Sequence, residues 1–348
     1  MIRQRYEAMK KVGETYSLIR ELSSMDGSDV GESVLDRVMY SAEALPPLGK
    51  EYWWLLFFGR DGEKPMQLML TIFRKYGRKM LFNDKEMMLG EVKENMFQAV
   101  TAGWIYDGET LHDLGDTNAT TEVRSEEKTV SSDISGRKMI LGGTFPNYRL
   151  QVHGVIDLHI GDVNGVADKS AQGVFIPPFG VGWVDIFLDA GGTVLEKPFR
   201  GTAHLQKVIG ITTFGPFHWG RVVFENGFST EFFGIKTGKD SRRHFHTSLT
   251  FRDFRNDKGV IFDNPTLRIR KEGKRWVVQG HDSYGHVRIV LESYAEKRYT
   301  MKGGGSQVYE EYAVVADEFH LDTRDGTISL DDLGKGVGTL EDAYGSPI

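Results

Sequence analysis

The sequence predicts an all-β fold made of two antiparallel β-barrels or strongly curved sheets, with one N-terminal amphipathic helix. From about residue 48, short runs alternate between apolar and polar residues, which is the period of a β-strand. Turn signals separate these runs roughly every 8–15 residues, and almost no second helical pattern is present. The 41 glycines against 10 prolines are typical of many tight turns. Together these features favour a sandwich or barrel architecture.

Residues 2–22 carry apolar side chains at intervals of three and four, the spacing of an amphipathic helix. The pattern ends in Ser-Ser-Met-Asp-Gly, a run of capping and turn residues. We assign residues 1–25 to this helix, whose apolar stripe either packs on the body of the protein or pairs with a second subunit in a homo-oligomer. The apolar positions are Ile2, Tyr6, Met9, Val12, Tyr16, Ile19 and Leu22.

The predicted strands form two groups, and in both groups the strands are short, β-rich and bounded by glycine. Residues 165–183 hold four glycines and a Pro-Pro pair, and we interpret them as a crossover between the groups. We therefore expect a first β domain over residues 26–175 and a second over 176–348. A barrel of about eight strands is wide enough for one small ligand, so we expect the site inside one barrel or at the junction of the two. The strands of the first group are EYWWLLFFG, MQLMLTIFR, AVTAGWIYDGETL, KMILGG and YRLQVHGVIDLHIG; those of the second are VDIFLD, GTAHLQKVIG, HWGRVVFENG, STEFFGIKTG, RHFHTSLTFRDF, PTLRIRKEGKRWVVQG, HVRIVLESY and SQVYEEYAVV.

Composition excludes several classes of function. The net charge of −6 and the absence of a basic block argue against nucleic acid as a partner. Without cysteine there is no disulfide, thiol catalysis or cysteine-ligated metal. No apolar run approaches the roughly 18 residues that span a bilayer, and the N-terminus lacks the apolar region of a signal peptide, so we expect a cytoplasmic protein. No motif indicates a cofactor, and His244 and His246, which share a predicted strand face, lack a carboxylate partner for a metal site.

Residues 201–227 are the segment on which the functional prediction rests. Thr202, His204 and Gln206 alternate with apolar residues and therefore share one face of a strand. Lys207 belongs to the opposite face unless a bulge intervenes. A second strand follows and ends in Asn226-Gly227, a strong hairpin signal. We expect the two strands to pair, and a line of polar groups in such a sheet either meets water or lines a cavity.

The candidate catalytic residues are His204, Gln206 and Asp185. His204 is a candidate acid or base near neutral pH, with a buried, hydrogen-bonded histidine as the alternative. Asp185 and Asp189 share a strand face with Trp183, which makes either a proton-donating site or a solvated strand end. His218 and Trp219 are expected at a barrel rim, and Glu231 is expected to face His204. The full set of candidate ligand-binding residues is Trp54, Trp183, Thr202, Lys207, His218, Trp219 and Glu231.

Four motifs in order resemble the carotenoid 1,2-hydratase (hydroxyneurosporene synthase) superfamily, which also includes tocopherol cyclase-like proteins and lipocalin-type Diels–Alderases. The resemblance implies two lipocalin-like (calycin-type) barrels and a hydrophobic ligand of isoprenoid, polyene or polyketide type. The motifs are Glu51-Tyr52-Trp53-Trp54 with Gly59 and Phe73-Arg74; residues 201–210; residues 219–227; and Gly336-Val337-Gly338-Thr339-Leu340-Glu341.

The second motif departs from the family pattern in a way that bears on chemistry. Gln206 stands at its acidic position, and Lys207 stands where hydratase-like members have histidine. A neutral amide exchanges hydrogen bonds but transfers no proton. We therefore expect a cofactor-free cyclisation, isomerisation, pericyclic or hydration-type reaction on a long apolar molecule. The alternative is a lipocalin-type carrier that performs no chemistry.

Overall fold

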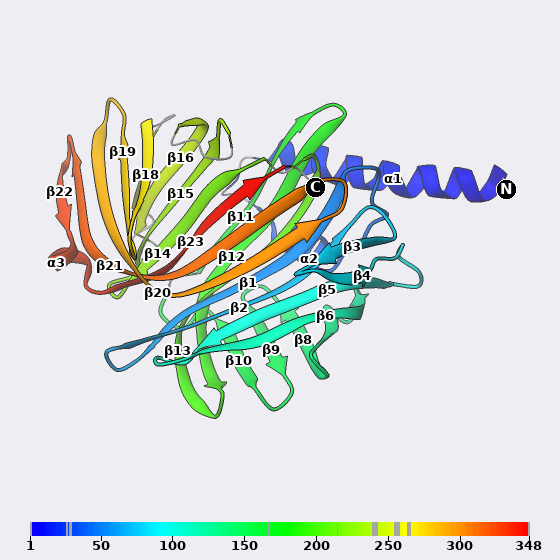
Figure 1. The fold of residues 1–348 in the computed structure, drawn as a ribbon, viewed down its shortest axis with the longest axis horizontal. Coiled ribbons are helices and arrows are strands. Elements are labelled where there is room, and N and C mark those ends of the chain that lie inside the picture. The colour runs from blue at the N-terminus through cyan, green and yellow to red at the C-terminus, as the bar shows by residue number, and fades with distance from the viewer. Residues whose placement is uncertain are drawn as a thin grey trace. The chain divides into compact units, whose positions relative to one another are not determined.

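The computed structural model describes residues 2–25, 27, 30–165, 167–213, 215–238, 243–253, 258–262 and 266–346. The chain divides into two compact units, residues 1–213 and 214–348. Each unit contains a curled antiparallel sheet, so the predicted all-β, lipocalin-like class is confirmed (Figure 1). Every segment that the sequence predicts to be a strand contains one.

The first unit contains a closed barrel. Its sheet has the order β10-β9-β8-β7-β6-β5-β2-β1-β13-β12-β11, and β10 also pairs with the second half of β12, which closes the ring. β3 and β4 pair with each other as a hairpin. The strands are β1 Gly49–Asp61, β2 Lys64–Lys75, β3 Lys79–Phe82, β4 Lys85–Met88, β5 Met96–Tyr106, β6 Leu111–Arg124, β7 Thr129–Ile134, β8 Arg137–Thr144, β9 Asn147–Val152, β10 Ile156–Gly161, β11 Asp168–Ile176, β12 Phe179–Val194 and β13 Lys197–Ile211.

The first unit extends beyond the boundary expected near residue 175. β13 pairs with β1 along its length, and β12 pairs with both β13 and β10, so these two strands complete the first barrel. For the same reason the expected hairpin between the strands of residues 201–210 and 218–227 does not form. The Asn226-Gly227 turn does join two paired strands, with Gly227 at a φ of 90°.

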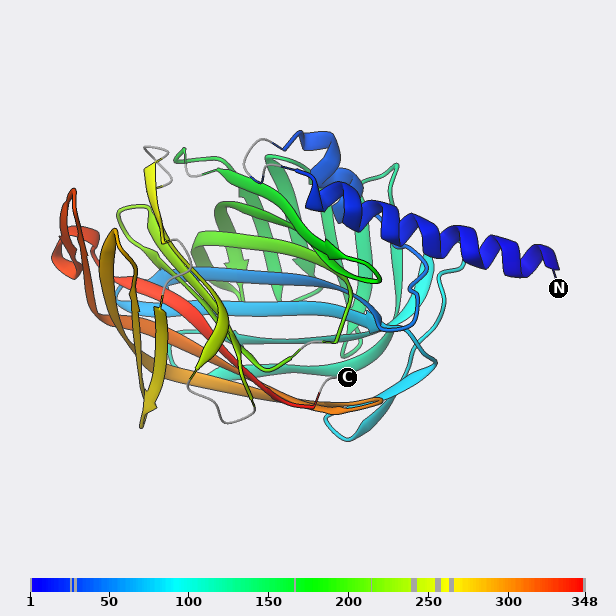
Figure 2. The ribbon, with the colours of Figure 1, turned by 90° about the horizontal axis from the view of Figure 1, so that it is seen from above.

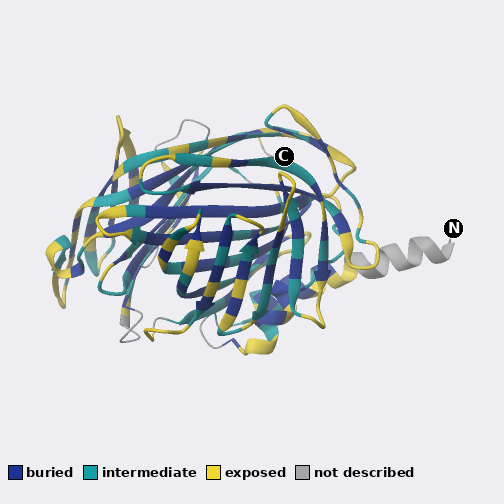
Figure 3. Ribbon diagram, turned by 90° about the horizontal axis from the view of Figure 1, so that it is seen from below, coloured by how far each residue is buried: buried dark blue, intermediate teal, exposed yellow. Residues whose placement is uncertain are grey.

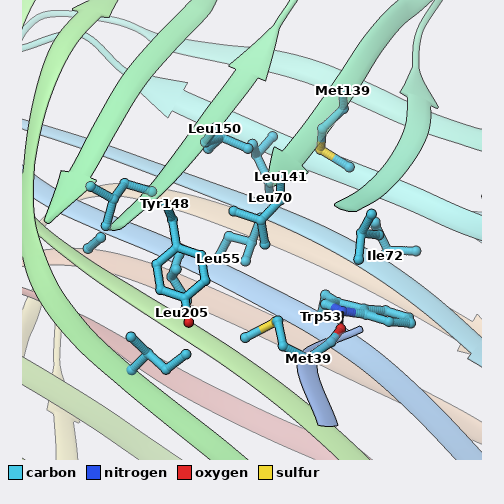
Figure 4. Packing of buried hydrophobic residues seen from close by; sticks show 14 of the residues in the cluster. Met39, Trp53, Leu55, Leu70, Ile72, Met139, Leu141, Tyr148, Leu150 and Leu205 are labelled. Carbon is cyan, nitrogen blue, oxygen red and sulfur yellow. Dashed lines mark hydrogen bonds between the residues drawn. The ribbon is translucent and has the colours of Figure 1, made fainter. Parts of the chain in front are cut away.

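The inside of the first barrel is packed with apolar side chains. Figure 4 shows residues from opposite strands pointing toward one another, among them Leu55, Leu70, Leu150 and Leu205, which are all buried. Met39 from the segment before β1 enters the same cluster. This core therefore occupies the interior of the first barrel, which is one of the places that the sequence predicted for a ligand.

Two helices precede the first barrel, α1 (Ile2–Ser23) and α2 (Glu32–Met39). The sequence predicts the first but not the second. The last turns of α1 lie beside β11 and β12 (Figure 2), and the buried Ile19 and Leu22 belong to the barrel core. The helix approaches so closely because Gly180 and Gly182 have no side chain on that face of β12. The apolar positions before residue 13 lie outside the described side chains.

Gly182→Val is expected to lower the free energy of unfolding by about 1–3 kcal/mol, because overpacking forces neighbours out of place. A Cβ at this position would lie 2.7 Å from Cδ1 of Leu22. Urea denaturation followed by circular dichroism measures the loss. Gly191→Ala in the same strand is the control, since its Cβ would meet only a carbonyl oxygen at 3.9 Å. Equal stability of the two variants would contradict the close approach of α1.

The second unit is a curled sheet with the order β17-β16-β15-β14-β23-β21-β20-β19-β18, and β22 pairs with β21. Its inward face carries a core of its own, which includes Phe232, Ile289 and Leu340. Buried and more exposed residues alternate along many strands of the structure (Figure 3). The elements are β14 Phe217–Phe224, β15 Phe228–Lys236, β16 His244–Asp253, β17 Lys258–Phe262, β18 Thr266–Glu272, β19 Arg275–His281, β20 Gly285–Lys302, β21 Ser306–Thr323, β22 Gly326–Ser329, α3 Leu330–Leu333 and β23 Gly336–Gly345.

In the described part of the chain, none of the helices has the length and apolar character needed to cross a membrane.

Candidate functional site on the outward face of β1, β13 and β12

His204 and Gln206 of β13 point away from the barrel interior. β13 runs without a register shift between β1 and β12, so its side chains alternate strictly. Ala203, Leu205 and Ile209 belong to the interior core, and His204 and Gln206 therefore stand on the outer face. The sequence left open whether this polar face meets water or lines a cavity; it does not line the interior of the first barrel, which takes the other half of the alternation.

Two of the three candidate catalytic side chains, His204 and Gln206, contact one carboxylate oxygen of the third, Asp185. Nε2 of His204 lies 2.8 Å from Oδ1 of Asp185, and Nε2 of Gln206 donates to the same oxygen over 2.8 Å. The His204 side chain is fully buried, whereas that of Asp185 is 18% exposed. Since an ionised carboxylate only accepts hydrogen bonds, it selects the histidine tautomer with a proton on Nε2. Nδ1 is then the basic atom of the neutral ring.

Apolar and aromatic side chains surround this cluster on the same face. Trp54 of β1 is the cross-strand partner of Gln206, and Leu56 is the partner of His204. Trp183 and Phe187 flank Asp185 along β12, and the ring centroid of Phe187 lies 6.4 Å from that of His204. Six of the predicted site residues thus share one face: Trp54, Trp183, Asp185, Thr202, His204 and Gln206. Alternation along β1 and β12 was the signal that would also have identified Leu56 and Phe187.

Asp189 shares this face with Asp185, as predicted, but serves a structural role. Its Oδ2 accepts hydrogen bonds from the backbone N–H groups of Val163 and Asn164, and its Oδ1 accepts one from the Asn164 side chain. The carboxylate therefore fixes the loop after β10. Thr202, the cross-strand partner of Asp189, lies at the same end of the face.

Lys207 is the predicted site residue of β13 that points into the barrel. It lies on the face opposite His204, as the regular alternation predicts, and this opposite face is the one that points into the barrel. Its Nζ lies 2.9 Å from a Glu51 oxygen and 4.1 Å from the ring centroid of Trp53, and it donates to the Ser41 carbonyl. Burial lowers the pKa of Lys207, and the Glu51 carboxylate opposes that shift. Arg74 completes the cluster by donating its Nε to Glu51 over 2.6 Å.

A cleft of about 420 Å³ opens beside this buried cluster, in the first unit. Ser41 and Glu43 line it with their neighbours, and their carbonyl oxygens accept hydrogen bonds from Lys207 and Arg74 on the other side. Burial, with the Glu14 and Glu51 carboxylates, raises the pKa of Glu43. The lining is mostly polar and suits an apolar ligand poorly. It consists of Glu14, Arg37, Tyr40, Ser41, Ala42, Glu43, Ala44, Val92, Glu94, Asn95, Ser125 and Lys128.

The remaining predicted residues lie in the second unit, on two faces of β14 and β15. Trp219 donates its indole N–H to Glu231 over 2.9 Å, and Arg221 pairs with the same carboxylate. His218 points to the opposite, inward face. His204 and Glu231 belong to different units, so the pairing expected between them stays a prediction.

A bulge separates the two histidines of β16. The register shifts between Ile235 and Lys236, so that His244 pairs with Lys236 and His246 with Ile235. His244 contacts His218 on the inward face, whereas the ring of His246 packs against Phe233 on the outward face. The expectation that His244 and His246 share a face is wrong, because a bulge reverses the alternation. Within the described ranges no three histidine, aspartate or glutamate side chains are grouped to hold a metal ion.

The pairings and the two cores define a lipocalin-like all-β protein with two β units. No protein-family model and no curated protein sequence matches the chain. Among solved structures it is similar to CghA with Sch210972, with a TM-score of 0.52 and 9% identity over 93% of this chain and 96% of that one. A second CghA structure gives 0.51 and 10% identity over 93% and 95%.

The match to kievitone hydratase from Nectria haematococca has a TM-score of 0.43 and 11% identity, and it covers 92% of this chain and 96% of that one. At the identities found, the likeness to CghA establishes the fold alone.

Proposed function

We propose that this protein binds a long apolar small molecule, of isoprenoid, polyene or polyketide type, against the outward face of β1, β13 and β12. There it promotes a cofactor-free cyclisation, isomerisation, pericyclic or hydration-type reaction. The observation that carries the proposal is the convergence of His204 and Gln206 on Asp185 beside the aromatic and apolar side chains of the same face. The resemblance of the sequence motifs to carotenoid 1,2-hydratases supports the class of ligand.

Each polar residue has a distinct role in this proposal. Asp185 orients His204 and stabilises the imidazolium when it forms, as carboxylates do beside catalytic histidines. Nδ1 of His204 removes a proton from one substrate atom and returns it to another. Gln206 has a second amide proton with which to polarise a substrate carbonyl. An isomerisation or cyclisation balances without a co-reactant, and a hydration consumes only water.

Trp54 and Trp183 supply the binding surface. They lie on either side of the polar cluster, one on β1 and one on β12. Flat aromatic faces hold an extended apolar chain by contact area at little cost in conformational entropy. A flexible substrate held between them is restricted to few conformers, which favours ring closure.

Mass spectrometry of an organic extract from purified protein is the first test, followed by incubation of the extracted compound with fresh protein. If the extract is empty, a panel of isoprenoid and polyketide polyenes replaces it. We expect the wild type to change the mass or spectrum of the compound with time. His204→Ala and Gln206→Ala should abolish turnover while folding stays intact, with a loss for His204→Ala of about 10²–10⁴-fold.

His159→Ala is the matched control, because His159 is an exposed histidine on β10 of the same unit. It should leave turnover unchanged. Wild-type turnover in both site variants would contradict the site. A compound that the wild type binds tightly and returns unaltered would instead identify a carrier.

A further inference from the structure

Two histidines form a hydrogen-bonded chain on the inward face of the second unit. Nδ1 of His218 lies 3.0 Å from Nε2 of His244, and Nδ1 of His244 lies 3.3 Å from the Leu267 carbonyl oxygen. At the other end, Nε2 of His218 lies 3.5 Å from Oδ1 of Asp342. The chain thus begins at a carboxylate of β23 and ends at a backbone carbonyl of β18.

Counting protons assigns the direction of this chain. Two neutral imidazoles carry two protons, whereas three contacts would need three. Both end groups only accept, so one of the two end contacts lacks a proton. Lys236 already donates to the same Asp342 oxygen, and the contact with Leu267 is the shorter of the two. We therefore assign the proton of His244 to Nδ1, from which it donates to Leu267. Its Nε2 then accepts, and His218 donates from its own Nδ1. The contact left without a proton is that between His218 and Asp342, which is also the longest, at the limit for a hydrogen bond.

The surrounding charges keep the histidine pair neutral. Lys236 of β15 pairs with Asp342, which removes the anion that an imidazolium would need. Burial lowers the pKa of His218, and Lys236 lowers it further against the opposing effect of Asp342. Burial and then His218 lower the pKa of His244 to about 4. The other side packed against His218 is the ring of Trp276 on β19, beyond which Lys271 of β18 adds another cation.

The hydrogen-bonded chain connects the two ends of the strand order of the curled sheet. β18 pairs with β19, and β16 lies at the other end of the strand order next to β17. In the described residues, β16 and β18 share no ladder pairing, and the bond from His244 to Leu267 joins them. We propose that His218 and His244 form an acid-sensitive latch that holds β18 to β16 and so keeps the inward face of the second unit closed.

The sign of the pH dependence follows from the neutral state of the closed latch. A histidine released from the latch takes up a proton near its ordinary pKa of about 6.5. In the closed latch the pKa values of both histidines are lower, so the closed state binds a proton less readily than the open state. Opening therefore becomes easier as the pH falls from about 6.5 toward 4, and above that range the latch is insensitive to pH. Each unit of pKa difference is worth a tenfold change in the opening equilibrium, reduced by the partial exposure of His244.

Hydrogen–deuterium exchange of the full chain at pH 7.5 and pH 5, corrected for intrinsic exchange rates, tests the latch without any ligand. We expect the amides of β18 to lose protection by about tenfold or more at pH 5. His244→Ala should lose that protection at both pH values. His244→Gln should keep it at both, because an amide N–H can donate to Leu267 but does not titrate.

Two further variants make the outcome decisive. Lys236→Met frees Asp342 as a counterion for the imidazolium, so the acid sensitivity of β18 should shrink. His246→Gln, on the other face of the same strand, should behave as the wild type. Protection of β18 that is equal at both pH values, or acid sensitivity that persists in His244→Gln, would overturn the proposal. All of these residues lie in the second unit, so failure here leaves the proposed site on β13 unaffected.

Discussion

Glu51→Gln is expected to lower the free energy of unfolding of the first unit by about 3–5 kcal/mol. The Glu51 carboxylate is fully buried and lies between Arg74 and Lys207, whose side chains are 3% and 0% exposed. Glutamine removes the carboxylate charge that contacts both cations of this cluster. An uncompensated buried charge costs far more than the pair contributes. Urea denaturation followed by tryptophan fluorescence measures the loss.

Two comparisons separate the buried charge from a general effect of glutamate replacement. Glu86→Gln breaks the exposed pair with Lys79, whose side chains are 53% and 63% exposed, and should cost less than about 1 kcal/mol. The triple variant Glu51→Leu, Arg74→Met and Lys207→Met replaces the whole cluster with apolar residues. It should be more stable than Glu51→Gln, because no charge is left unbalanced. A loss below about 1 kcal/mol for Glu51→Gln would mean that water reaches the cluster.

The alternation of β-strands made part of the candidate site predictable. It placed Thr202, His204 and Gln206 on one face, and Asp185 on the face of Trp183. Sequence alone did not place β12 next to β13 in the register that joins Asp185 to His204. The two strands form a hairpin with a two-residue turn at 195–196, where both residues have a positive φ. Leucine and glutamate are not the residues that mark such a turn in a sequence, so the hairpin and its register left no local signal.

The direction in which the polar face points was not predictable for a different reason. β1 carries large apolar residues on both faces, with Leu55 and Phe57 inside and Leu56 and Phe58 outside. Hydrophobicity therefore does not mark the inward face of this strand. Lys207 also obscured the direction, because a lysine in a strand usually indicates the solvent-facing side. It is buried here because it forms an ion pair with the buried Glu51, which the sequence did not reveal.

The bulge in β16 shows a further limit of alternation. His244 and His246 are two residues apart and would share a face in any regular strand. A register shift of one residue sends them to opposite faces, and no glycine or proline lies between them on β16; the nearest glycine, Gly234, is on the neighbouring strand β15. The sequence therefore did not predict that His218 and His244 pair in the second unit, although each of them was a candidate on its own.

Asp185→Asn is expected to reduce turnover by about 10²–10⁴-fold without unfolding the protein. Asparagine has nearly the same size and can still accept the hydrogen bond from Gln206. It lacks the charge that stabilises the imidazolium, and its amide N–H can turn toward Nε2 of His204 and drive the proton to Nδ1. The histidine then presents the wrong tautomer to the substrate. Steady-state kinetics should show a fall in kcat with KM nearly constant, because Trp54 and Trp183 still bind the ligand.

Asp189→Asn provides the matched comparison, since the two aspartates share a strand and a face. Asp189 binds the loop at Val163 and Asn164, so its replacement should affect stability more than turnover. Equal kcat values for the two variants would remove Asp185 from the reaction. A rise in KM with kcat unchanged would place Asp185 in ligand binding, and His204 would then act without a carboxylate partner. Only a selective loss of kcat in Asp185→Asn fits a histidine whose proton position is set by the carboxylate beside it.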